Sequence, residues 1–231
     1  MRKLIALILV MVLSLFTFSA LADSSIVVTG TGETYIPADT AVVSLGISAR
    51  NADALKAQAE ANEVIARIRA ALTGAGLKEE DINTGYVDLY GMYDYSGYEE
   101  KLTGYRASSS LAVLVKDISR VGEVIDLAFG AGANMLDGVS FSASDDSAAR
   151  AESLKAALAE AKEKAAVLAE AAGMGELKIE SIQETGFFAY DNGTNRFVTK
   201  AAGAAETDAA TIIQAAKICV SATVTVTFKT K

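Results

Sequence analysis

The residue types that most often carry out catalysis are nearly missing from this chain of 231 residues. It has no histidine, and its one cysteine is Cys219. Without histidine, a Ser-His-Asp or Cys-His arrangement and a histidine-ligated metal site are excluded. A single cysteine excludes an internal disulfide and a cysteine-ligated zinc or iron–sulfur centre. Carboxylate chemistry such as glycoside hydrolysis remains, and it requires two carboxyl groups on either side of a cleft.

No pair of carboxylates in the sequence is compelling for hydrolysis. Two short acidic runs could bind a cation such as calcium, Glu79-Glu80-Asp81 and Asp145-Asp146. Neither run has the ligand spacing of a calcium-binding loop. Each stands where we expect a turn or the start of a helix, and negative charge at a helix N-terminus stabilises the helix dipole. We therefore expect no catalytic, cofactor-binding or metal-binding residues, and no cofactor.

A Gly-x-Gly pattern occurs at residues 30–32, directly after the β-rich segment 25–29. A dinucleotide-binding loop would continue into a helix, whereas the next residues here are Glu33-Thr34-Tyr35-Ile36-Pro37. The sequence therefore predicts a turn or bulge at 30–32, and not a phosphate site.

Tyrosine is concentrated in one part of the chain, since six of its eight tyrosines lie between residues 86 and 105. Tyrosine offers a large contact area at a small entropic cost, so an exposed cluster favours contact with a protein or a glycan. The alternative is ordinary cross-strand pairing in a hairpin. Further aromatic residues begin the tract 187–211, which we expect to be either a plain long loop or a partner-binding segment. The predicted interaction surface consists of Tyr86, Tyr90, Tyr93, Tyr95, Tyr98, Tyr105, Phe187, Phe188 and Tyr190.

Cys219 lies within a predicted strand, between Ile218 and Val220. We interpret it as a small buried apolar residue. The alternative is a thiol that forms an intermolecular disulfide or reacts with oxidants, although Lys217 alone would depress its pKa little.

The first 22 residues have the organisation of a secretory signal peptide. Arg2 and Lys3 precede an apolar run at 4–18, and Ala20-Leu21-Ala22 is a small-x-small cleavage site. The run is shorter than the roughly 20 residues of a membrane-spanning helix, so we expect cleavage and no membrane span afterwards. Loss of the two basic residues leaves 19 basic and 29 acidic side chains, a net charge of −10. We expect an exported protein, periplasmic or at the cell surface, that does not bind nucleic acid.

The hydrophobic period predicts three helices, at 51–73, 117–129 and 145–172. Asn51 is the predicted N-cap of the first helix and Asp117 that of the second. Strands are predicted at 25–29, 40–48, 82–93, 105–116, 136–143, 177–185 and 218–228. The predicted inward residues of the first helix are Leu55, Ala59, Ile65, Ile68 and Leu72, with Asn62 beside them. Those of the last helix are Leu154, Leu158, Ala161, Ala165, Leu168 and Ala172.

This order of elements predicts an α+β fold, with antiparallel or mixed β-sheets and helices packed on one face. Two β-α-β-type units, at 40–93 and 105–143, are followed by the long Ala-rich helix. We treat 23–231 as one domain, divisible into sub-units 26–100 and 101–231.

Seven segments in this order resemble the SIMPL-domain family of bacterial secreted and periplasmic proteins. They are 26–47, the helix with Asn62, 76–84, 104–115, the Gly-Ala turn at 130–133, the helix at 151–172, and 220–228. The resemblance implies an exported α+β domain with no established enzymatic activity and no catalytic residues to carry over. Family members are often described as envelope or surface antigens, some are linked to stress tolerance, and some assemble into large rings.

The chain departs from the family pattern before its last strand. Family members usually have a Pro-Gly-containing turn there, whereas this chain has Ile213-Gln214-Ala215-Ala216-Lys217. The geometry of that loop, and any oligomer contact made by it, therefore does not follow from the resemblance.

Three functions are compatible with these observations. The first is an exported, non-enzymatic envelope or surface protein that forms homo-oligomers and acts as a structural or interaction module. The family resemblance adds a stress-related role to this first function. The second is a small-molecule or glycan-binding protein that uses the Tyr-rich hairpin and the tract 187–211. The third and least favoured is a carboxylate-only hydrolase.

Overall fold

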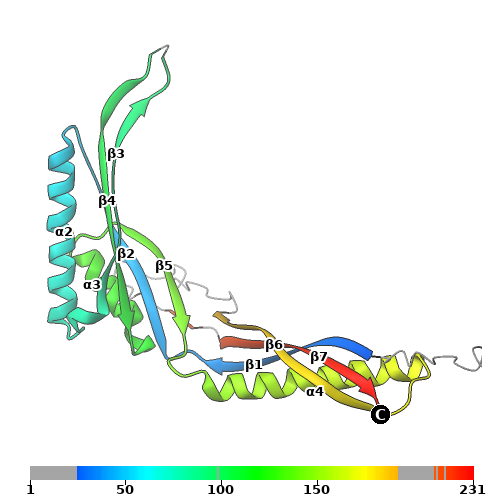
Figure 1. Ribbon diagram of the computed structural model, residues 1–231. Helices are drawn as coiled ribbons and strands as arrows, with labels where there is room; N and C mark the ends of the chain where they lie inside the picture. The colour runs from blue at the N-terminus through cyan, green and yellow to red at the C-terminus, as the bar shows by residue number, and fades with distance from the viewer. Residues whose placement is uncertain (1–24, 98, 192–210, 212, 216) are drawn as a thin grey trace, which may run out of the picture.

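The protein is an L-shaped molecule with two arms, each made of an antiparallel sheet and the helices that cover one of its faces (Figure 1). The structure is a computed structural model and describes residues 25–97, 99–191, 211, 213–215 and 217–231. The predicted signal peptide at 1–22, Tyr98, and residues 192–210 of the predicted loop tract 187–211 lie outside these described residues.

The first arm contains a three-stranded sheet and the longest helix. Its strands are β1 (Ser25–Pro37), β7 (Lys217–Thr230) and β6 (Leu177–Asp191), in the order β1-β7-β6. Helix α4 (Ser147–Ala171) runs along one face of this sheet. Apolar residues such as Val28, Val226 and Phe228 form a small separate core with α4, whereas Ile218 and Val220 of β7 belong to the larger core of the second arm.

The second arm contains a four-stranded sheet in the order β3-β4-β2-β5. The strands are β2 (Thr40–Asn51), β3 (Ile82–Asp94), β4 (Lys101–Val115) and β5 (Met135–Ser142). Helices α2 (Ala54–Gly74) and α3 (Val121–Gly130) lie on one face (Figure 1). Short 3₁₀ turns at Glu79–Asp81 and Ile118–Arg120 lead into β3 and α3. Asp117 caps the second turn, where it accepts a hydrogen bond from the Ser119 N–H. The predicted α+β class and the predicted order of elements are confirmed.

Residues 30–32 are not a turn, which corrects the prediction made from the Gly-x-Gly pattern. Strand β1 continues to Pro37 and pairs with β7 without interruption. Gly30 and Gly32 face α4, and a Cβ on Gly30 would lie 2.0 Å from the Ala157 carbonyl oxygen. These glycines therefore let the helix lie against the strand at backbone distance.

The helix presents an equally small surface to that strand. Its fully or nearly buried positions recur every fourth residue: Ala149, Ser153, Ala157, Ala161, Ala165 and Ala169. The prediction of a seam through the leucines is therefore wrong in part, because Leu168 is 48% exposed and Leu154 and Leu158 are half-buried. Only small side chains fit where glycines bring the backbones together, so the larger side chains are displaced to the flanks.

Helix α2 also differs from its predicted boundary and face. Its N-cap is Asp53, whose carboxylate accepts hydrogen bonds from the Leu55 and Lys56 N–H groups, and Asn51 ends β2. The buried residues are Ala57, Ala61, Val64, Ile68 and Leu72. Leu55 and Ala59 are exposed, Ile65 is half-buried, and Asn62 is exposed and accepts a bond from Gln58 Nε2. In the first two turns the buried positions are thus the alanines at 57 and 61 in place of the predicted 55 and 59, while Ile68 and Leu72 are buried as predicted.

Candidate interaction surface

The β3–β4 hairpin extends well beyond the helices of the second arm (Figure 1). Pairing between the strands continues from Ile82 opposite Val113 to Asp94 opposite Lys101, interrupted by bulges near Thr84 and Met92. The outer half carries exposed apolar residues on both faces, among them Val87, Leu89, Tyr90 and Leu102. A two-stranded ribbon has little stability by itself, and an apolar ribbon in solvent is a typical site for contact with another surface.

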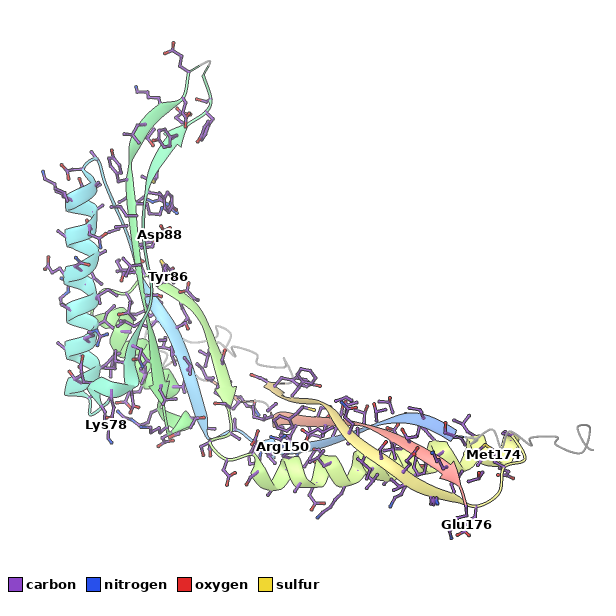
Figure 2. All side chains as sticks on the ribbon, viewed as in Figure 1. Lys78, Tyr86, Asp88, Arg150, Met174 and Glu176 are labelled. Atoms are coloured by element: carbon purple, nitrogen blue, oxygen red, sulfur yellow. The ribbon has the colours of Figure 1, made fainter. Side chains whose placement is uncertain are left out.

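Tyr86 and Asp88 lie on the side of the hairpin opposite α2 (Figure 2). The Tyr86 N–H donates to Ser110 Oγ at 3.1 Å, which fixes the bulged backbone there. Partial burial raises the pKa of the Tyr86 hydroxyl, and the carboxylates of Asp137 and Asp88 raise it further. The phenol therefore stays protonated at neutral pH, as a hydrogen-bond donor beside two negative charges.

Tyr90 stands opposite Arg106 on the neighbouring strand, and the Arg106 guanidinium lies 5.8 Å from the centroid of the tyrosine ring. Such a cation–π contact orients the ring without burying it, and Tyr90 keeps 43% of its surface exposed. Near the tip, Tyr93 and Tyr95 form a tilted pair with ring centroids 6.4 Å apart. Tyr105 is half-buried and packs against the core of the arm.

The predicted aromatic residues of 187–190 belong to the other arm. They are part of β6, so this strand extends beyond its predicted end at Thr185 to Asp191. Phe187 is half-buried under the Arg150 guanidinium, 4.2 Å from the ring centroid, whereas Phe188 and Tyr190 are exposed. The outer part of the hairpin and strand β6 lie well apart in Figure 1. The structure thus places the predicted residues on two separate surfaces, and it brings Tyr86 and Tyr90 together on one of them.

Cys219 is fully buried in β7, as the sequence predicted. Its direct neighbours on the adjacent strands are Tyr35 of β1 and Tyr190 of β6. Hydrogen bonding raises the pKa of both phenols, for Tyr35 chiefly through Glu33 and for Tyr190 chiefly through the thiol. The sequence analysis did not identify Tyr35 as a neighbour of Cys219. It ended the first strand at residue 29 and placed a turn at 30–32, so Tyr35 was not assigned to a strand.

The side chains of the two acidic runs form ion pairs and hydrogen bonds within the fold. Glu79, Glu80 and Asp81 form ion pairs with Arg69, Lys78 and Lys116 respectively, at 2.6, 3.3 and 2.9 Å. Asp145 accepts a hydrogen bond from the Ser147 N–H at the start of α4. Among the described residues, no group of three or more Cys, Asp or Glu side chains is placed to hold a metal ion. Within the same residues, no helix combines the length and the apolar character needed to cross a membrane.

Comparison with known proteins gives the family. The profile of the SIMPL family, described as a protein of unknown function (DUF541), matches residues 26–228. The chain belongs to the SIMPL family. That match covers both arms of the L, from β1 to β7.

Named relatives come from several bacteria. The chain is 32% identical over 164 residues to a 26 kDa periplasmic immunogenic protein of Brucella abortus, covering 69% of this chain and 66% of that protein. It is 28% identical over 144 residues to the uncharacterized protein YggE of Escherichia coli K12, covering 62% and 58% of the two chains. The chain thus spans just under two thirds of the length of the Brucella relative. These relatives confirm the family expected from the sequence.

Proposed function

We propose that this SIMPL protein is an exported, non-enzymatic module of the cell envelope that self-assembles and acts through its surfaces. The observation that carries the proposal is the β3–β4 hairpin, an apolar and aromatic ribbon that projects from the body of the molecule. The name of the Brucella relative, a periplasmic immunogenic protein, supports the periplasm as the location. A stress-related role is part of the proposal on the family resemblance, and a deletion strain that survives envelope stress as well as the wild type would contradict it.

Self-assembly is tested by light scattering on the purified mature chain. We expect a mass above that of one chain, and a lower mass when Tyr90, Tyr93 and Tyr95 are replaced together by serine. Tyr95 is 72% exposed, and none of the three belongs to a buried core, so the fold should persist. Val167→Ser is the matched control, because Val167 is 61% exposed on α4, in the other arm. A strictly monomeric wild-type protein at high concentration would refute self-assembly.

The second candidate is a small-molecule or glycan-binding protein that uses the same hairpin. It is favoured by the grouping of Tyr86, Tyr90, Asp88 and Arg106, which offers stacking surfaces beside hydrogen-bonding groups. A ligand that binds only the folded state raises the melting temperature. A thermal-shift screen with glycans and metabolites should then give a hit that Tyr90→Ala removes. No shift across the panel would refute this candidate.

A further inference from the structure

The outer edge of β1 is one boundary of the first sheet. On its inner side the strand pairs with β7 along its whole length, from Ser25 opposite Lys229 to Pro37 opposite Lys217. Alternate N–H and C=O groups of an edge strand point away from the sheet, and these unpaired groups invite pairing with a strand of another chain. Whether these outward groups of β1 are already hydrogen-bonded therefore determines whether another chain can pair with this edge.

Helix α4 reaches this edge because the contact between helix and strand is unusually close. A Cβ on Gly32 would lie 2.1 Å from the Ser153 carbonyl oxygen, and one on Gly30 would lie 3.0 Å from the Ala161 Cβ. The glycine pattern and the alanine stripe thus bring the helix within side-chain reach of the strand's backbone.

Two side chains of α4 bond the outward backbone groups of the strand. Lys164 Nζ donates to the Thr29 carbonyl oxygen at 3.0 Å, and the Thr31 N–H donates to the Glu160 carboxylate. Lys164 and Glu160 also form an ion pair at 3.0 Å. Positions four apart on a helix are separated by about 6 Å along its axis, close to the rise of two residues on a strand. The spacing therefore lets one ion pair satisfy two successive outward groups.

We propose that Glu160 and Lys164 close the β1 edge against the addition of a strand from a second copy of this chain. The two side chains occupy two successive outward groups near the middle of β1, the Thr29 carbonyl and the Thr31 N–H, which an added strand would have to bond. The proposal deepens the proposed self-assembly, because it excludes one sheet edge from it. Both side chains are about half exposed, so the ion pair itself contributes little to folding stability. The ion pair instead determines whether the β1 edge is available for pairing with another chain.

The test is the double variant Glu160→Ala/Lys164→Ala in the full mature chain, with mass measured by light scattering at the concentration used for the wild type. Pairing of two opened β1 edges should give about a twofold higher mass than the wild type, because such a contact is two-fold symmetric. Adding Thr31→Pro, which removes the outward N–H, should restore the wild-type mass. The milder Lys164→Met keeps the aliphatic stem and frees only the Thr29 carbonyl, and it should give a smaller increase if the double variant does not fold.

The matched control is Glu152→Ala/Lys155→Ala, which removes another ion pair of the same helix, 2.8 Å long and exposed. It should leave the mass unchanged. A folded double variant of wild-type mass would overturn the proposal, and so would an equal increase in the control, which would indicate a general effect of charge. Because the readout is a ratio to the wild type, it is independent of whether the wild type itself assembles.

Discussion

The carboxylate of Asp39 accepts two hydrogen bonds from Ser144, one from the N–H at 2.7 Å and one from Oγ at 2.6 Å. Asp39 lies between β1 and β2, and Ser144 lies between β5 and α4, so the pair joins two of the segments by which the chain passes from one arm to the other. A backbone bond from the Asp39 N–H to the Ser142 carbonyl runs beside it at 3.1 Å. At the corner of the L these hydrogen bonds add to the apolar packing of Ala149, Ile218 and Val220 on the core of the second arm.

Replacing Asp39 by alanine should lower the melting temperature at pH 7 by a few degrees. The bonds from Ser144 hold the pKa of Asp39 below its usual value. A lowered folded-state pKa contributes stability above the unfolded pKa of about 4, and this contribution is lost as the pH falls through the folded value. The difference between wild type and variant should therefore be constant above about pH 5 and shrink below pH 4. Thermal melts from pH 2 to 7 measure it.

Asp94→Ala provides the control for the corner. Asp94 accepts a comparable bond from the Ser96 N–H at 2.9 Å, which likewise lowers its pKa, but it lies at the hairpin tip. Its replacement should leave the distribution of distances between the arms unchanged, whereas Asp39→Ala should broaden that distribution. Spin labels at Lys56 and Glu170, in a Cys219→Ser background, report that distance. Equal distributions for both variants would contradict a role of Asp39 in the corner.

Gly30→Ala should destabilise the first arm strongly. The added methyl carbon would lie 2.0 Å from a backbone oxygen of α4, which cannot move aside as a flexible side chain could. Overpacking of this kind costs about 1–3 kcal/mol, and more where backbone must shift. Gly74→Ala, with no atom within 4 Å of the added carbon, should be neutral or slightly stabilising at the end of α2. Denaturant titration compares the two, and equal unfolding midpoints would contradict the close contact.

The same glycine illustrates what the sequence could not predict. Gly30 and Gly32 look locally like a turn, and their reason for being glycine is Ala157, more than 120 residues away. Likewise, Leu168 was predicted inward because hydrophobicity usually marks the buried face. Here the close approach selects small residues, and alanine carries little hydrophobic signal. Long-range packing, which no local window contains, decided both positions.

The hairpin was predictable because its signals are local. Strand alternation in 82–93 and 105–116 and the glycines between them indicate two strands and a turn, and the structure confirms them. The sequence also placed six tyrosines in this hairpin, but it could not separate Tyr105, which packs on the core, from Tyr95 at the exposed tip. That distinction depends on how far the helices extend along the sheet.

Ser153 is the one polar member of the small-residue stripe of α4, and its replacement by alanine should cost about 1 kcal/mol. Its Oγ is fully buried and donates to the Val220 carbonyl oxygen at 2.7 Å, tying the helix to β7. Ser153→Leu should cost more, since no space exists beside Gly32. Chemical denaturation measures both variants. An alanine variant as stable as the wild type would show that the bond contributes nothing net.

The Cys219 thiol should be unreactive in the native protein. It is fully buried between Tyr35 and Tyr190, whereas a thiol must be accessible as a thiolate to attack a disulfide reagent. We expect no colour with Ellman's reagent in buffer and one equivalent per chain in denaturant. Tyr190→Ala removes one flanking ring at the exposed edge of the sheet and should make the thiol react in the folded state. Leu55→Ser, remote from the thiol, should leave it protected. Immediate reaction of the folded wild type would contradict the burial and would restore an intermolecular disulfide as an explanation for this cysteine.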